Sequence, residues 1–193
     1  MQNFTHFTHE SVTDFVAKIT HIWNVYGKSA YSLTSNYRHD LVNISPKMID
    51  STLFGKWIKS NLGEIDNCKF FVCEANMWGE THIDGGDIPR NCAINIPIAD
   101  CNKGVMNWFS NSDVSTPKST SRTNVHSSDF SKDVNYWNSK DTMLLTQPAL
   151  VRTNCWHNID NRLNPNPRIV FSIRLKNNPQ FEDILDKIKP WVV

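Results

Sequence analysis

The residues with the clearest chemical potential in this sequence are a histidine and an aspartate two positions apart, His82 and Asp84, followed by two glycines. Alternate residues of a strand point to the same face, so this pair can converge on one metal ion. His157 is the natural third ligand, because it ends another predicted strand and turn-like residues follow it. Two histidines and one carboxylate on one face of an octahedral ion favour Fe(II) and leave positions open for a co-substrate and oxygen.

The histidine–x–aspartate triplet is a weak signal by itself. With 7 histidines and 19 acidic residues among 193, chance gives about 0.7 such triplets in a chain of this composition. The order of the following segments strengthens it: a strand, a polar loop, a strand ending at His157, and then Arg168 eleven positions later. The alternatives are an exposed His82–Asp84 pair, a structural His157 bonded to backbone, and a surface salt bridge at Arg168.

Short segments bounded by glycine, proline and asparagine must position these residues, and their spacing is typical of an antiparallel β-sandwich or barrel. We expect strands at residues 68–75, 90–98, 105–109, 142–146, 149–157 and 168–175. The last of these alternates a polar with an apolar face: Arg168, Val170, Ser172 and Arg174 against Ile169, Phe171, Ile173 and Leu175. Such a polar face suits either solvent or an enclosed site.

Helical periodicity marks both ends of the chain. Apolar residues recur at three- and four-residue steps over 12–26, and Gly27 is expected to end that helix. Ser45 and Pro46 signal the start of a second helix that Gly63 closes. Its inward positions are predicted to be Met48, Ile49, Leu53, Trp57 and Ile58.

We therefore expect a single domain of three parts: a helical buttress at 1–65, a β-barrel core at 66–177 and a C-terminal helix at 178–193. The core includes a stretch at 110–141 dominated by serine, threonine, asparagine, aspartate and lysine. Its composition cannot bury much apolar surface, so it is predicted to form a long loop or mobile flap beside the metal.

Charge and composition exclude several classes of partner. The formal net charge is +1, from 20 basic and 19 acidic residues, so neither duplex nucleic acid nor an anionic membrane is an expected partner. No apolar run approaches the roughly 20 residues of a membrane helix, and the first residues do not resemble a signal peptide. The five cysteines are odd in number and lack a C-x-x-C pair, which predicts reduced thiols in a cytoplasm.

Two segments carry a family resemblance: HIDGGDIPRNCAINIPI at 82–98 and NCWHNIDNRLNPNPRIVFSIRL at 154–175. They resemble the double-stranded β-helix oxygenases that use Fe(II) and 2-oxoglutarate, in particular small phage and marine-microbial members near the aspartyl/asparaginyl β-hydroxylases. The resemblance implies a jelly-roll or cupin-like barrel buttressed by the N-terminal helices, with O2 as the oxidant. It also implies the cytoplasm of a microbe or of a phage-infected host cell.

The same resemblance assigns roles to residues. His82, Asp84 and His157 match the metal-binding triad, and Arg168 matches the basic residue that holds the distal carboxylate of 2-oxoglutarate. A planar fork of donors suits that carboxylate on physical grounds as well. Arg90, eight residues after His82, resembles an arginine that contacts the keto acid in the aspartyl/asparaginyl hydroxylases. Further candidates are Asn95, as a weaker cofactor-binding residue, and Arg174 and Asn154.

Three functions remain open from the sequence. The first is a dioxygenase that hydroxylates an unidentified substrate, for which the resemblance implies a protein or peptide side chain and a small molecule is the other choice. The second is a cupin-like metal protein without oxygenase activity. The third is a β-sandwich interaction module without a metal. Arg168 discriminates between the first two, because only the oxygenase requires a buried cation for a dicarboxylic co-substrate.

Overall fold

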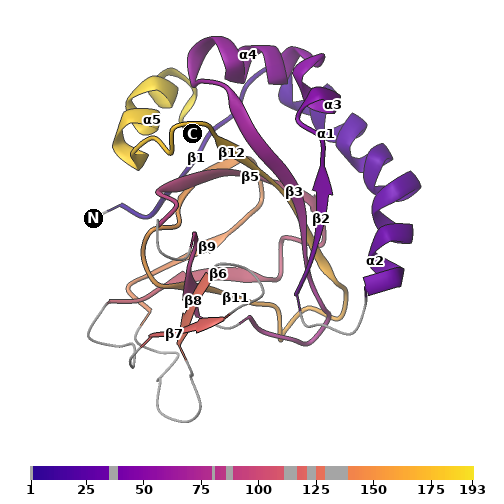
Figure 1. Ribbon diagram of the computed structural model, residues 1–193, viewed down its shortest axis with the longest axis vertical. Helices are drawn as coiled ribbons and strands as arrows, with labels where there is room; N and C mark the ends of the chain where they lie inside the picture. Colours follow the sequence, from indigo (N-terminus) through magenta and orange to yellow (C-terminus); the bar gives the residue numbers. More distant parts are fainter. Residues whose placement is uncertain are drawn as a thin grey trace.

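The computed structural model describes residues 2–34, 39–79, 81–85, 89–110, 117–120, 125–128 and 139–193. Two antiparallel six-stranded sheets face each other (Figure 1). The first has the order β1 (Phe4–His6), β10 (Ala149–Arg152), β5 (Cys92–Ala99), β12 (Arg168–Leu175), β3 (Ile65–Cys73), β2 (His39–Ile44). The second has the order β7 (Pro117–Thr120), β8 (Val125–Ser128), β4 (His82–Ile83), β11 (His157–Asp160), β6 (Val105–Trp108), β9 (Asp141–Leu144).

The chain passes between the sheets in the manner of a double-stranded β-helix. From β3 to β6 each strand lies in the sheet opposite its predecessor, and from β9 to β12 the same alternation resumes. This arrangement confirms the predicted fold, a mainly β jelly-roll barrel with flanking helices. Two strands, β1 and β2, come from the first third of the chain, which the sequence predicted as helical only. They extend the edges of the first sheet through β10 and β3 and so satisfy backbone groups there.

Side chains of β12 separate the two hydrophobic cores. Ile169, Phe171, Ile173 and Leu175 all belong to the core between the first sheet and the helices. Val170, on the other face, belongs to a second core between the sheets. The alternation predicted from the sequence is therefore confirmed, and the polar face of this strand is the one that faces the barrel interior.

Helices cover the outer face of the first sheet (Figure 1). They are α1 (Val12–Ile22), the π-helix η1 (Trp23–Gly27), α2 (Lys28–Thr34), α3 (Lys47–Asp50), α4 (Leu53–Asn61), α5 (Phe181–Ile188) and the 3-10 turn η4 (Lys189–Trp191). None of the helices in the described ranges is long and apolar enough to cross a membrane.

Two helix predictions need correction. Gly27 does not end the first helix, which continues through it into α2; instead the missing side chain makes room for Trp23, whose Cε3 would lie 2.2 Å from a Cβ at position 27. The predicted second helix is divided, because the Thr52 hydroxyl caps a new helix by accepting a hydrogen bond from the Gly55 amide (2.9 Å). Because of this break the predicted apolar positions do not share one helix face, and Met48 and Leu53 are exposed rather than buried.

The segment predicted as a long loop, residues 110–141, is described only in part. Its described portion contains β7 and β8, which pair with each other, and β8 also pairs with β4 through Ile83 and His82. These two strands were not predicted, because serine- and threonine-rich segments lack the apolar alternation that identifies a half-buried strand. Residues 111–116, 121–124 and 129–138 lie outside the described ranges, and the prediction that the segment is a mobile flap beside the metal stays a prediction.

Candidate metal centre

Pairing of β4 with β11 brings two histidines together. His82 and His157 are direct cross-strand partners, and their ring centroids are 4.4 Å apart. Residues directly opposite on neighbouring strands have close Cβ atoms and point to the same face. His157 begins β11 rather than ending a strand, contrary to the sequence prediction. The predicted strand at 149–157 is in fact β10, a turn, and β11, so that His157 starts in the second sheet.

Asp84 follows β4 at a turn that directs its carboxylate back to the histidines. Its amide donates to the Thr153 carbonyl (3.1 Å) and its carbonyl accepts from the Arg90 amide (2.8 Å). Gly85 follows with φ +100°, a conformation that favours glycine. Asp84 Oδ1 lies 3.2 Å from His82 Nε2 and 3.9 Å from His157 Nε2.

The three side chains form a possible metal site. One ligand atom from each of His82, Asp84 and His157 lies within 4.8 Å of the others. Adjacent ligands of an octahedral ion, each about 2.1 Å from it, are about 3 Å apart, so small side-chain movements complete the geometry. The predicted trio is therefore together in space, and the donor set is the one expected for a non-haem iron site.

Arg174 organises the acidic member of the trio. Its Nη2 donates to Asp84 Oδ2, while Nη1 donates to the Cys92 carbonyl (2.8 Å) and to the Thr153 hydroxyl (2.7 Å). Burial raises the pKa of Asp84, but the Arg174 charge and the hydrogen bond to His82 outweigh it and hold that pKa well below its usual range. Asp84 is consequently a carboxylate with one oxygen held by Arg174 and the other facing the histidines.

His157 is held as a neutral ligand. Its Nδ1 lies 2.9 Å from the Cys155 carbonyl, which can only accept, so Nδ1 carries the proton and Nε2 presents its lone pair. Burial and, to a smaller extent, the nearby His82 lower the pKa of His157 to about 4. The imidazole is therefore neutral at neutral pH, with Nε2 free of a proton, which is the state that binds a metal.

Arg168 is a buried cation at the start of β12. It is 3% exposed, and its Nε and Nη2 have no hydrogen-bond partner among the described residues. Gly104 makes room for it, since a Cβ there would lie 2.7 Å from Arg168 Cδ. Its position on the inner face of β12 excludes the alternative of a surface salt bridge.

The remaining candidates have different surroundings. Arg90 is half-buried, and its Nη2 lies 3.5 Å from Asp66. Asn154 donates from its amide to Asn91 Oδ1 (3.0 Å), a contact that joins the turn before His157 to the residue before β5. Asn95 is the register partner of Ser172 on the inner face of β12, and its buried Oδ1 has no partner within the described ranges.

Thr153 was missed from the sequence. Its hydroxyl accepts from Arg174 and donates to the Arg90 carbonyl (2.6 Å), and its backbone holds Asp84. Nothing in the local sequence marks a threonine in a turn for this role. Arg174 was visible as a polar residue on the inner face of the last strand, but its partner was not.

Comparison of the sequence with protein-family models and with curated proteins gives no match. The structure is similar to that of SnoK, a non-heme alpha-ketoglutarate-dependent carbocyclase from nogalamycin biosynthesis (TM-score 0.51, 12% identity, 89% of this chain and 79% of that chain). It is also similar to AviO1 from Streptomyces viridochromogenes Tue57 (TM-score 0.50, 11% identity, 92% of this chain and 91% of that chain). At such low identity the likeness establishes the fold alone.

Proposed function

We propose that this chain is an Fe(II)- and 2-oxoglutarate-dependent oxygenase. The observation that carries the proposal is Arg168, a buried guanidinium whose Nε and Nη2 lack partners among the described residues. A buried charge without partners is costly, and a carboxylate can satisfy two parallel donors of the guanidinium at once. Neither a cupin-like metal protein nor a metal-free β-sandwich module requires such a cation.

The donor set supports an iron site. His82 and His157 would each contribute Nε2 and Asp84 would contribute Oδ1, with Arg174 keeping that carboxylate ionised and oriented. When bound, Fe(II) with 2-oxoglutarate and O2 supplies oxidation of a C–H bond to an alcohol, with release of succinate and CO2. The protein's own contribution is ligand geometry, orientation of the co-substrate and exclusion of water.

Co-substrate orientation is assigned to the inner face of β12. Arg168 and Arg174 lie six residues apart on this face, about 20 Å along an extended strand. Arg174 is at the end next to Asp84. We assign Arg168, at the other end, to the distal carboxylate of 2-oxoglutarate; the assignment requires the long Arg168 side chain to extend along the barrel toward the metal centre. Asn95 lies between them, opposite Ser172, and its amide oxygen, which has no partner among the described residues, supports a weaker role with the same molecule.

The substrate class is a finer proposal. We propose a protein or peptide side chain, on the sequence resemblance to the aspartyl/asparaginyl β-hydroxylases alone. Arg90 carries part of that resemblance, and its proximity to Asp66 gives it a smaller part in co-substrate binding than Arg168.

All five cysteines are free thiols, which supports the proposed location in a reducing cytoplasm.

The direct test is metal analysis of the pure protein together with succinate release from 2-oxoglutarate. We expect one iron per chain and succinate release that requires both Fe(II) and O2. Asp84→Ala is the matched control and should lose iron at micromolar metal. Iron binding without affinity for 2-oxoglutarate would favour the cupin-like protein, and the absence of any metal binding would favour the interaction module.

A further inference from the structure

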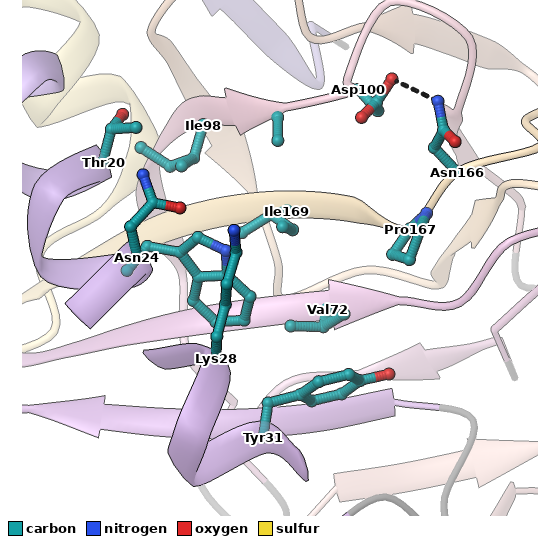
Figure 2. Close-up of a pocket in the computed structure, with 12 residues that line it drawn as sticks. Thr20, Asn24, Lys28, Tyr31, Val72, Ile98, Asp100, Asn166, Pro167 and Ile169 are labelled. Carbon is teal, nitrogen blue, oxygen red and sulfur yellow. Dashed lines mark hydrogen bonds between the residues drawn. The ribbon is translucent and has the colours of Figure 1, made fainter. Parts of the chain in front are cut away.

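A pocket of about 460 Å³ lies outside the barrel, between the N-terminal helices and the outer face of the first sheet (Figure 2). The apolar residues Val72, Ile169 and Ala99 form its floor, and they are register neighbours on β3, β12 and β5. Figure 2 shows Thr20, Asn24 and Lys28 of the helices on one side of the space. Asp100, Asn166 and Pro167 lie across from them. The volume is in the range of small-molecule sites, about 300–1,000 Å³.

This pocket is distinct from the candidate metal centre. Successive side chains of β12 point to opposite faces of the sheet, so Ile169 faces the helices while Arg168 faces the barrel interior. None of the three candidate metal ligands lines the pocket. Binding in the pocket and binding at the metal centre can therefore be measured separately.

The indole N–H of Trp23 is a buried hydrogen-bond donor at this pocket. It lines the pocket and is 4% exposed, and its indole Nε1 has no hydrogen-bond partner within the described part of the chain. A buried N–H without a partner costs free energy that a ligand acceptor would recover. The indole is held by the π-helix η1, where Gly27 leaves the space that its ring occupies. Such π-helical turns are rare and occur frequently at functional sites.

Lys28 adds a positive charge on the same side. It follows η1 directly, lines the pocket, and forms no salt bridge with any residue in the described ranges. Asn24, one helical turn earlier, adds an amide. On the opposite side Asp100 has one carboxylate oxygen engaged by Asn166 (3.0 Å). The helical side thus offers donors and a cation, and the opposite side offers an acceptor.

We propose that this pocket binds a small organic acid with an apolar body. Its acidic group would lie against the cation of Lys28. It would accept from the indole N–H of Trp23, which is unpartnered among the described residues, after a small movement of the ring that uncovers this buried nitrogen. Its apolar body would cover Val72, Ile169 and Ala99. A hydrogen-bond donor on the far end of the ligand would meet the carboxylate of Asp100.

The experiment uses 8-anilinonaphthalene-1-sulfonate, which has an anionic group, an apolar ring system and an N–H donor. Titration into ¹⁵N-labelled protein should shift the indole N–H signal of Trp23, identified by its loss in Trp23→Phe. Trp57 is the internal control, since its Nε1 is also buried and unpartnered among the described residues but does not line the pocket. The Trp57 signal should not move.

Two lysine variants complete the test. Lys28→Gln should weaken binding of the probe about tenfold, as expected for loss of one charge-assisted contact at a partly open site. Lys18→Gln, at an exposed position of α1 that does not line the pocket, should bind like the unmodified protein. Equal affinities for the two variants, or a probe that shifts the Trp57 signal and leaves Trp23 in place, would overturn the proposal. Lys28 is exposed, so its variant is expected to fold even if Trp23→Phe does not.

Discussion

Arg174 holds one oxygen of the Asp84 carboxylate, so that the other oxygen faces both histidines of the candidate metal centre. The two residues are ninety positions apart in the chain, and their contact links the last strand of the barrel to the turn after β4. Asp84 is therefore oriented and ionised before a metal arrives. This reduces the ordering that metal binding must impose.

Replacing Arg174 should weaken the metal site without removing a ligand. Arg174→Gln is expected to lower affinity for Fe(II), or for Co(II) as a stable substitute, by roughly 10–100-fold, the usual effect of losing a group that orients a ligand. Titration of metal-free protein measures it. Arg162→Gln is the matched control, because that arginine is half-exposed and pairs with Asp160 instead. Similar affinities in the two variants would show that Arg174 has no part in the site.

Replacing Arg168 should affect the stability of the protein and its affinity for 2-oxoglutarate differently. Arg168→Met retains most of the side-chain volume and removes a buried charge whose Nε and Nη2 lack hydrogen-bond partners among the described residues, so the ligand-free variant is expected to be as stable as the unmodified protein or more stable. Its affinity for 2-oxoglutarate should fall by roughly a hundredfold or more, because two charge-assisted hydrogen bonds are lost. Metal affinity should not change, and Arg168→Lys should give intermediate co-substrate binding.

Calorimetric titration with 2-oxoglutarate and urea unfolding measure these two effects. Undiminished 2-oxoglutarate affinity in Arg168→Met would remove the main support for the oxygenase over the cupin-like protein. A large loss of stability would instead indicate a structural ion pair for this arginine.

Metal-free protein should lose stability on acidification through His157. The pKa of this side chain is about 4 in the folded state and about 6.5 when unfolded. As pH falls from 6.5 toward 4, the unfolded chain takes up a proton that the folded chain does not, so unfolding becomes more favourable. Between pH 7 and pH 5 the contribution is on the order of 2 kcal/mol.

Urea unfolding after chelation of metals tests this pH dependence. His157→Gln lacks the titrating group, so its free energy of unfolding should fall less over the same interval. Parallel pH curves for the two proteins would contradict the assignment of a neutral, buried imidazole.

Gly104 should be intolerant of a side chain for steric reasons. A Cβ at this position would lie 2.4 Å from Asn161 Oδ1 and 2.7 Å from Arg168 Cδ, so Gly104→Ala must displace one of them. We expect a loss of about 1–3 kcal/mol in the free energy of unfolding and weaker 2-oxoglutarate binding. Gly63→Ala is the comparison, since it meets no atom within 4 Å and is strained only through its φ of +130°. It should be destabilised with its 2-oxoglutarate affinity intact.

Several features followed from the sequence because they depend on near neighbours in the chain. The His82–Asp84 spacing, the alternation along 168–175 and the end of the second helix at Gly63 are local patterns. A strand presents every second residue to the same face, so Arg168 and Arg174 had to share one. The position of His157 next to turn-like residues predicted it as the third ligand, the resemblance to the oxygenases matched the same three residues, and the structure brings them together.

Tertiary structure decided what joins these local patterns. The run 149–157 reads as one strand, yet the chain changes sheets within it, and only this change puts His157 beside His82. The contacts of Thr153 and Arg174 with Asp84 also join distant segments. Periodicity reports which face a residue occupies, whereas register and sheet crossing depend on long-range packing and backbone pairing. The sequence alone thus determined the candidate ligands and the polar face of the last strand, and the fold determined that the candidate ligands lie together.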